Sequence, residues 1–467
     1  MAITLADSRG CAIAGKGQGR GTMSEIGQQR ERGVNRFSRM NTRLLTKIGR
    51  RPVATGIYHG WLVVGAVFVI GAFGFGIGFY GPGIYLVALR ARYGWSAAEI
   101  SFAITAYYLL GAMLTFFSGE IFECFGARMV VAAGAIAMAC AVLMLALVTR
   151  LWQVYAAFIL MAPGWAAMSG AAINIIIAPW FERRRGMAVK FAFNGPTAGG
   201  IVVVPLLTLL IARFGFAIAL QAAVAVMVAI VIPIATLILR PKRAEERDRA
   251  DRSDSASKSQ LSEKMSVSEE APWALSRVMR SARFQTISIP FALGLLAQVG
   301  LLTHQIAYLS PILGATGAAW AVSLTTSAAV VGRTITGFFI DKVDRRMTAC
   351  GNFLVQIAGV AILAASRSAP MLYFGCVLFG LGVGNTSSLP SLIVHQEFPG
   401  RSFARIVSLI VAIDQFTFAF GPSLLGYLRQ LTGSYTASLV ACLVIEAAAA
   451  VIVILPVLAR SVRGSRS

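Results

Sequence analysis

Charged residues are scarce in this chain of 467 residues, where Asp, Glu, Lys and Arg together account for only 13%. About a quarter of an average soluble protein is charged, so this shortage excludes a water-soluble multidomain protein. Six cysteines in so long a chain are too few for a secreted disulfide framework. The 57% share of hydrophobic residues excludes a disordered or fibrous protein. A polytopic membrane protein is the class that remains.

The short motifs of catalysis and of nucleotide or metal binding are also missing. The sequence has no Walker loop, no zinc-ligand spacing and no nucleophile elbow. We therefore expect neither an enzyme nor a cofactor nor a metal site. The net charge is +22, but the positive residues lie in tails and in loops between apolar runs. That distribution orients a membrane protein, so we expect no nucleic-acid partner.

Apolar runs long enough to cross a hydrocarbon core of about 30 Å recur along the chain from Tyr58. Each is predicted to be a helix, because an isolated strand leaves its backbone polar groups unsatisfied in lipid. The second begins at a predicted capping box, Ser96-Ala-Ala-Glu99. The twelve expected spans are 60–88, 100–118, 129–149, 152–179, 187–212, 216–239, 285–313, 318–340, 348–366, 369–394, 403–428 and 436–459.

Loop charges predict the orientation and the division of the chain. Arginine and lysine gather on the side that holds both ends of the chain, so both termini are expected in the cytoplasm and the protein in the plasma (inner) membrane. A mixed-charge, serine-rich stretch splits the helices six and six. The predicted segments are a basic disordered cytoplasmic tail at 1–57, a six-helix bundle at 58–240, a cytoplasmic linker at 241–283, a second six-helix bundle at 284–460 and a cytoplasmic tail at 461–467.

The two halves repeat each other at corresponding helices. One triplet recurs 218 positions later and another recurs 226 positions later. Many secondary transporters are built from such repeated halves, with the binding site between them. The first pair of triplets is Gly119, Glu123, Arg128 with Gly337, Asp341, Arg346, and the second is Gly195, Pro196, Gly200 with Gly421, Pro422, Gly426.

These residues resemble the major facilitator superfamily over about 58–460. The family has a Gly-x-x-x-Asp-Arg/Lys-x-Gly-x-Arg/Lys loop after its second helix and an echo of it after the eighth. The segments here are Gly119-Glu-Ile-Phe-Glu123-Cys124-Phe-Gly126-Ala-Arg128 and Gly337-Phe-Phe-Ile-Asp341-Lys342-Val-Asp344-Arg345-Arg346. The resemblance implies an all-α fold of two pseudo-repeated six-helix bundles. It also implies gating loops at Gly119, Glu123, Arg128, Gly337, Asp341, Arg345 and Arg346, with a weaker charge network in the first copy.

Within the superfamily the chain looks like the branch of monocarboxylate porters and oxalate–formate antiporters. The similar pieces are His59-Gly60-Trp61, Tyr93-Gly94-Trp95-Ser96, Trp180-Phe181-Glu-Arg-Arg-Arg185-Gly186 and Gly332-Arg333-Thr-Ile-Thr-Gly337. The resemblance implies a transporter of small organic anions that works by alternating access, either as a proton symporter or as an anion exchanger. Its expected partners are the anion, a proton or counter-anion, and membrane lipid.

Arg333 is the strongest candidate for binding substrate. It precedes Asp341 by eight residues, which places it about 12 Å into the membrane on a helix. An arginine there costs at least ~2.5–3.5 kcal/mol to insert, so it should face a cavity or a partner. Its planar fork suits a carboxylate, and in the resembling branch the arginine at this position binds the substrate carboxylate. The alternative is a structural pair with another helix.

Asp414 lies in the middle of the eleventh expected helix, where antiporters of the branch carry lysine. It is a candidate both for substrate binding and for proton coupling, pairing with Arg333 and taking up a proton when a carboxylate arrives. Binding the amino group of a zwitterion and a fixed ion pair remain alternatives.

Further polar residues within the expected helices complete the candidate site. His304 can donate to a carboxylate, and Gln298 and Gln305 lie nearby on the same helix. A satisfied interhelical hydrogen bond is the alternative for each. Weaker candidates are Tyr107, Asn174 and Asn385.

Gly195-Pro-Thr-Ala-Gly199-Gly200 supports a second function. It is similar to a motif of proton-coupled drug exporters in the same superfamily, so an exporter of drugs or amphipathic metabolites is the alternative function. The echo at Gly421, Pro422 and Gly426 favours a packing role instead.

Overall fold

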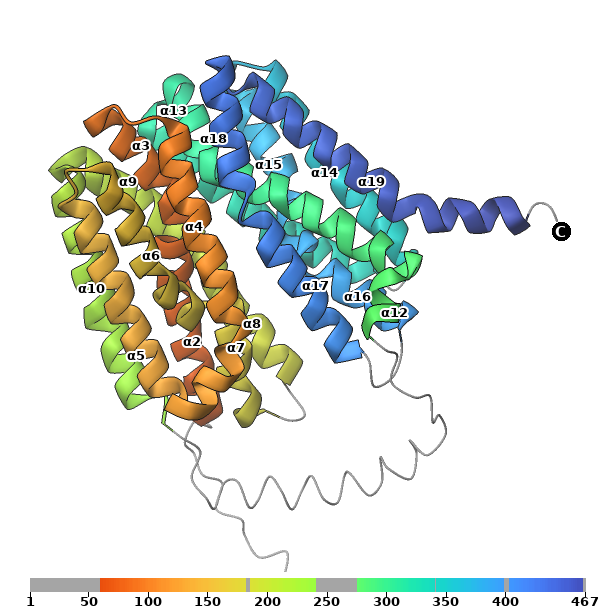
Figure 1. The fold of residues 1–467 in the computed structure, drawn as a ribbon, viewed down its shortest axis with the longest axis horizontal. Coiled ribbons are helices and arrows are strands. Elements are labelled where there is room, and N and C mark those ends of the chain that lie inside the picture. Colours follow the sequence, from red (N-terminus) through yellow and green to blue (C-terminus); the bar gives the residue numbers. More distant parts are fainter. Residues whose placement is uncertain (1–58, 182–184, 241–274, 341, 399–402, 465–467) are drawn as a thin grey trace, which may run out of the picture. The chain divides into compact units, whose positions relative to one another are not determined.

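Helices make up nearly all of the described chain in the computed structural model (Figure 1). The structure describes residues 59–181, 185–240, 275–340, 342–398 and 403–464. The predicted tail at 1–57, residues 241–274 of the predicted linker, and Asp341 lie outside these ranges.

The first half of the chain contributes the helices before the linker, here called the N-terminal bundle. Two of its long helices contain one π-helical turn each, η1 and η3. In chain order the elements are α2 (His59–Phe75), η1 (Gly76–Tyr80), α3 (Gly81–Tyr93), α4 (Ala97–Phe116), α5 (Ser118–Ala146), α6 (Leu151–Met168), α7 (Gly170–Ile177), η2 (Ala178–Trp180), α8 (Arg185–Ala198), η3 (Gly199–Val203), α9 (Val204–Phe214) and α10 (Phe216–Leu237).

The second half contributes the C-terminal bundle, which begins inside the predicted linker because residues 275–280 already form a helix. Its last helix continues into the predicted C-terminal tail as far as Gly464. The elements are α12 (Leu275–Arg280), α13 (Ala282–Phe339), α14 (Arg345–Ala365), α15 (Ala369–Thr386), α16 (Leu389–Glu397), α17 (Phe403–Phe418), α18 (Gly421–Thr432) and α19 (Thr436–Gly464).

Eleven helices of the described chain are long and apolar enough to cross a membrane. The longest, α13, has 58 residues and is broken at Gly314, whose φ of 73° and ψ of 168° are not helical. It therefore crosses twice, which gives twelve crossings. The prediction of an all-α polytopic membrane protein is confirmed.

The predicted capping box at the start of α4 is also confirmed. The Glu99 amide donates to the Ser96 hydroxyl at 3.2 Å, and the Ser96 amide donates to the Glu99 carboxylate at 2.8 Å. Both groups satisfy backbone donors that a helix start otherwise leaves free.

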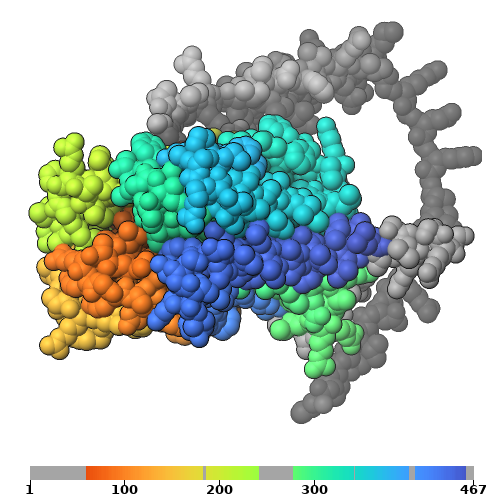
Figure 2. Space-filling view, turned by 90° about the horizontal axis from the view of Figure 1, so that it is seen from above, coloured from red at the N-terminus to blue at the C-terminus, as the bar shows by residue number. Residues whose placement is uncertain are grey.

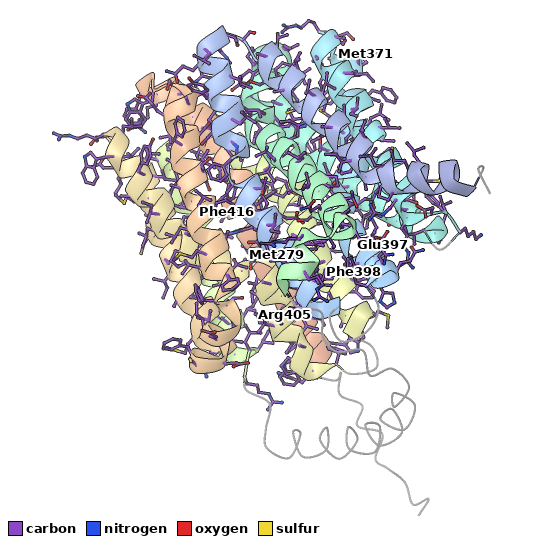
Figure 3. The ribbon with its side chains drawn as sticks, turned by 45° about the vertical axis from the view of Figure 1, so that its right-hand side comes forward. Met279, Met371, Glu397, Phe398, Arg405 and Phe416 are labelled. Atoms are coloured by element: carbon purple, nitrogen blue, oxygen red, sulfur yellow. The ribbon has the colours of Figure 1, made fainter. Side chains whose placement is uncertain are left out.

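The two bundles lie side by side and contact each other at one end, through pairs such as α4 with α18 and α3 with α13 (Figure 1). We call this the closed end, and the other, where α10 ends and α12 begins, the linker end. Figure 2 looks onto the closed end, where atoms of both bundles pack together. In Figure 3, Met371 marks the closed end of the C-terminal bundle, and Glu397 and Arg405 lie near its linker end.

The repeated glycines bring the helices of each bundle into close contact. A Cβ atom at Gly195 would lie 2.0 Å from the carbonyl oxygen of Phe68, and one at Gly421 would lie 2.5 Å from that of Leu296. Gly195 thereby packs α8 against α2, and Gly421 packs α18 against α13. The two glycines occupy equivalent positions in the two halves.

The last glycine of each triplet contacts the opposite bundle. A Cβ atom at Gly200 would lie 2.7 Å from the Thr326 side chain, and one at Gly426 would lie 2.6 Å from the Ser101 hydroxyl. The repeat in the sequence therefore corresponds to a repeated contact, first within a bundle and then between bundles.

Candidate functional site

Arg333 lies in the second membrane crossing of α13 and is half-buried. Its Nε donates to the carbonyl oxygen of Gly384 in α15 at 3.1 Å. Within the described chain, the terminal nitrogens Nη1 and Nη2 have no hydrogen-bond acceptor. One edge of the guanidinium is therefore anchored, and the other is available to a planar anion.

Tyr80 brings the N-terminal bundle next to this arginine. It is the last residue of η1, its ring lies near Thr326 in α13, and it is within electrostatic range of Arg333. Gly200 makes room for this arrangement, because a Cβ atom there would lie 2.8 Å from both the Tyr80 ring and the Thr326 hydroxyl. Tyr80 was not among the residues selected from the sequence.

Three tyrosine hydroxyls hold the π-helical turn that positions Tyr80. Tyr85 donates to the carbonyl oxygen of Ile77 at 3.1 Å, Tyr107 to that of Gly78 at 2.8 Å, and Tyr108 to that of Phe79 at 3.1 Å. A π turn leaves carbonyl groups outside the α-helical pattern, and such turns are frequent at functional sites. The structure thus places Tyr107, a predicted binding residue, in a supporting position behind η1.

An aromatic cluster surrounds η1, and we define it as Phe75, Phe79, Tyr80, Tyr108, Trp165 and Phe418. Phe79 stacks on Trp165 with ring centroids 5.7 Å apart and an interplanar angle of 20°, and it meets Tyr80 edge-on at 5.1 Å. Phe418 of the C-terminal bundle meets Tyr108 edge-on at 5.7 Å. The cluster therefore includes rings from both bundles.

Asp414 lies in α17 and is 5% exposed. Its Oδ1 has no hydrogen-bond partner, and no ion pair joins it to Arg333 among the residues that the structure describes. Burying an ionised carboxylate without a partner is costly, whereas a neutral acid tolerates such a place far better. The environment of Asp414 therefore suits a group that holds a proton.

Glu446 is a second buried acid, in α19, with both carboxylate oxygens lacking a hydrogen-bond partner in the described chain. Cys442, one turn earlier, contacts the carbonyl oxygen of Ala297 in α13, so this face of α19 packs inside the C-terminal bundle.

His304 forms a junction between the bundles at the closed end. Its Nε2 lies 3.0 Å from the carbonyl oxygen of Pro422 and 3.2 Å from the Ser101 hydroxyl. Because a carbonyl only accepts, we assign the ring proton to Nε2, so that Nδ1 accepts from the Tyr435 hydroxyl at 3.1 Å. Burial raises the pKa of the Tyr435 phenol, which keeps it a donor. His304 is thus fully hydrogen-bonded at the closed end.

Gln298 and Gln305 of α13 are buried in the same membrane crossing as His304. Gln305 donates to the Thr325 hydroxyl at 2.8 Å and to the Cys376 sulfur at 3.3 Å. The side-chain carbonyl oxygens of Gln298 and Gln305 have no hydrogen-bond donor in the described residues.

The asparagines take part in hydrogen bonds within the protein. Asn174 donates to the carbonyl oxygen of Gly170 in its own helix at 3.0 Å. Asn385 donates to the Asn352 side chain of α14 at 3.1 Å, next to Gly384, the residue that anchors Arg333. Asn385 therefore directly follows the residue whose carbonyl oxygen accepts from Arg333, whereas Asn174, in the described chain, bonds only within its own helix.

The two predicted gating loops differ in structure. In the first, Gly119, Glu123 and Arg128 are exposed, and a kink at Gly126 interrupts α5. In the second, Gly337 is exposed, Asp341 lies outside the described residues, and Arg345 donates to the carbonyl oxygen of Leu392 at 2.5 Å.

Arg346 is the most constrained residue of the second loop, with 2% exposure. Its Nε and Nη2 donate to the two carboxylate oxygens of Glu397 at 2.6 and 2.9 Å. Nη1 donates to the backbone carbonyls of Thr286 and Val453 at 3.0 and 3.2 Å. The residue thus joins α13, α14, α16 and α19 at the linker end. Glu397 was not selected from the sequence, in which it is marked only as a carboxylate at the end of an apolar run.

Comparisons with known proteins agree with this architecture. The family model described as "Major Facilitator Superfamily" matches residues 66–317 and 305–467. Monocarboxylate transporter 13 of Rattus norvegicus is 24% identical over 389 residues, which cover 82% of this chain and 85% of that protein. Human monocarboxylate transporter 11 is 24% identical over 397 residues, which cover 81% and 79%.

Solved structures share the fold at low sequence identity. An inward-facing, occupied bacterial homologue of the human lysosomal transporter Spinster has a TM-score of 0.65 at 16% identity, covering 86% of this chain and 97% of that one. The nucleoside transporter NupG has a TM-score of 0.66 at 12% identity, covering 84% and 98%. The predicted resemblance is confirmed: the chain is a membrane transport protein similar to monocarboxylate transporters, and it belongs to the Major Facilitator Superfamily.

Proposed function

We propose that this protein is a secondary active transporter of small organic anions, in the first instance monocarboxylates. It works by alternating access, with proton symport or anion exchange as the driving process. The observation that carries the proposal is the position of Arg333, anchored through Nε to Gly384 and next to Tyr80 of the other bundle, with Nη1 and Nη2 free of acceptors in the described protein.

A planar fork of this kind recognises a carboxylate through two parallel hydrogen bonds, which lysine cannot reproduce. Such a contact is stabilising in the membrane interior, because burying an arginine there is unfavourable in free energy unless it faces a cavity or a partner. The similar proteins named monocarboxylate transporters support the same substrate class.

The contacts between the bundles support alternating access. At the closed end, Ser423 donates to Thr105, and Ser323 donates to the carbonyl oxygen of Ile201 at 3.0 Å. In a rocking mechanism these contacts break when the bundles open at that end. The excess of arginine and lysine on the linker side favours a cytoplasmic position for the linker end and for both termini, in a plasma (inner) membrane.

Uptake into proteoliposomes tests the proposal. The purified full-length chain is reconstituted and offered a panel of small carboxylates, with an internal pH dye and protein-free liposomes as background. We expect transport of at least one carboxylate, loss of at least about tenfold in Arg333→Ala, and incomplete rescue in Arg333→Lys. Arg367→Ala is the matched control, because Arg367 is exposed at the closed end.

Uptake that persists in Arg333→Ala for every transported carboxylate would overturn the assignment of Arg333 as the substrate-binding residue. The alternative function, proton-coupled export of drugs or amphipathic metabolites, predicts efflux of such compounds under an imposed proton gradient with no carboxylate flux. The Gly195-Pro-Thr-Ala-Gly199-Gly200 segment motivates this alternative, although its glycines pack helices and Gly421 makes the equivalent contact.

A further inference from the structure

One ring of the aromatic cluster, Tyr80, lies within electrostatic range of the arginine to which we assign the carboxylate. Tyr80 links the two, because it interacts with Arg333 on one side and meets Phe79 edge-on at 5.1 Å on the other. A carboxylate held by Arg333 therefore has the Tyr80 ring nearby, followed by the Phe79 ring that meets it edge-on in η1.

The rings next to Tyr80 are only partly covered. Phe75, Phe79 and Tyr80 are half-buried, although they lie in the middle of a membrane-crossing helix. The two rings behind them, Tyr108 and Trp165, are buried to 1% and 6% exposure and form a rigid backing. The exposed edges of the front rings are therefore fixed in position.

The opposite bundle contributes the last ring of the cluster. Phe418 in α17 is half-buried and meets Tyr108 edge-on at 5.7 Å. The C-terminal bundle thus supplies both a cation, Arg333, and an aromatic ring, and the N-terminal bundle supplies the stacked pair Phe79 and Trp165. A ligand that touches Arg333 and the cluster at once contacts both bundles.

Aromatic side chains prefer other rings over aliphatic groups of the same size. Their negative faces and positive edges favour offset-stacked and edge-on pairs with centroids about 4.5–7 Å apart. The pairs within the cluster already have this geometry, with Phe75 and Trp165 edge-on at 4.8 Å. A planar ring can extend the same pattern, whereas a puckered saturated ring cannot.

We propose that the preferred substrate is an aryl carboxylate, an anion with one carboxylate and one aromatic ring. Arg333 holds the carboxylate, and Phe79, backed by Trp165, together with Phe418 contacts the ring. Tyr80 lies between the two groups and sets their spacing. This inference rests on the proposed transport of organic anions and specifies the body of the substrate.

Three 2-oxo acids test the preference: phenylglyoxylate, its saturated analogue cyclohexylglyoxylate, and pyruvate. The 2-oxo group makes all three more acidic than simple carboxylic acids, so they stay ionised near neutral pH and cross lipid slowly. In proteoliposomes of the full-length chain, we expect kcat/KM for phenylglyoxylate to exceed that for cyclohexylglyoxylate by about tenfold, the combined effect of two ring contacts. We expect Phe79→Leu and Phe418→Leu each to lower this ratio at least about threefold.

Phe374→Leu is the matched control, because Phe374 is 51% exposed in α15 and belongs to no aromatic pair of the described chain. Equal kcat/KM values for the aromatic and saturated acids, or an equal loss for all three acids in both Phe variants, would overturn the aryl preference. If no carboxylate of the wider panel, these three acids included, shows Arg333-dependent uptake, the proposed function itself fails, so the two failures are distinguishable.

Discussion

Ser423 of the C-terminal bundle donates a hydrogen bond of 2.5 Å to the Thr105 hydroxyl of the N-terminal bundle. Both residues are buried, at 7% and 6% exposure. The bond lies between α18 and α4, at the end where the bundles contact each other. Any conformation that opens this end must break it and hydrate both hydroxyls.

Replacing Ser423 with alanine should therefore favour opening at the closed end. A neutral hydrogen bond contributes about 0.5–1.5 kcal/mol, so the open population should rise roughly 2- to 10-fold. Spin labels at the exposed positions Arg213 and Arg367, in a chain freed of its native cysteines, report the distance between the bundles. Thr432→Ala, at an exposed position in the same helix, should leave the distance distribution unchanged. An unchanged distribution in Ser423→Ala would show that this bond does not hold the end closed.

The repeated glycines predict matched losses of stability. Gly195→Ala places a Cβ atom 2.0 Å from a backbone oxygen of α2, and Gly421→Ala places one 2.5 Å from a backbone oxygen of α13. Backbone atoms cannot move aside as a flexible side chain can, and overpacking of this kind costs about 1–3 kcal/mol or more. We expect a lower Tm in detergent for both variants. Gly351→Ala is the control, because a Cβ atom there meets nothing within 4 Å; an equal Tm in all three would contradict the packing role.

The sequence predicted the fold well because membrane crossings follow from hydropathy alone. Apolar runs, loop charges and the two repeated triplets indicated twelve helices in two related halves. In the described chain, two of these crossings run together as the single element α13, and the non-helical backbone at Gly314 separates them. The π turns escaped prediction because they depend on tertiary hydrogen bonds, such as those from Tyr85, Tyr107 and Tyr108 to three successive carbonyls.

Pattern alone could not tell which polar residues are already satisfied by the protein. His304 and Arg333 are both candidates in the sequence, yet His304 has partners on both nitrogens, whereas only Nε of Arg333 is bonded in the described chain. Tyr80 looks like an ordinary apolar-face aromatic in the sequence, and its position near Arg333 depends on contacts between bundles that no helical spacing encodes.

The second predicted gating loop should contribute more to stability than the first. Arg346 and Glu397 form a buried bidentate ion pair, whereas Arg128 is exposed. Removing one partner of a buried pair leaves the other charge unpaired and costs about 3–5 kcal/mol. Arg346→Ala and Glu397→Gln should each lower the Tm in detergent markedly, and Arg128→Ala should leave it nearly unchanged. Equal Tm losses at Arg128 and Arg346 would refute the asymmetry between the loops.

Asp414 should carry the proton if transport is proton-coupled, because its buried carboxyl has no ion-pair partner in the described chain and Oδ1 lacks a hydrogen bond. Asp414→Asn keeps the shape but cannot exchange a proton. We expect it to lose carboxylate-driven acidification at least about tenfold while retaining exchange of labelled for unlabelled substrate, which needs no net proton movement. Glu446→Gln is the matched variant, since Glu446 is equally buried but packs inside the C-terminal bundle. Acidification that survives Asp414→Asn and disappears in Glu446→Gln would move proton coupling from α17 to α19.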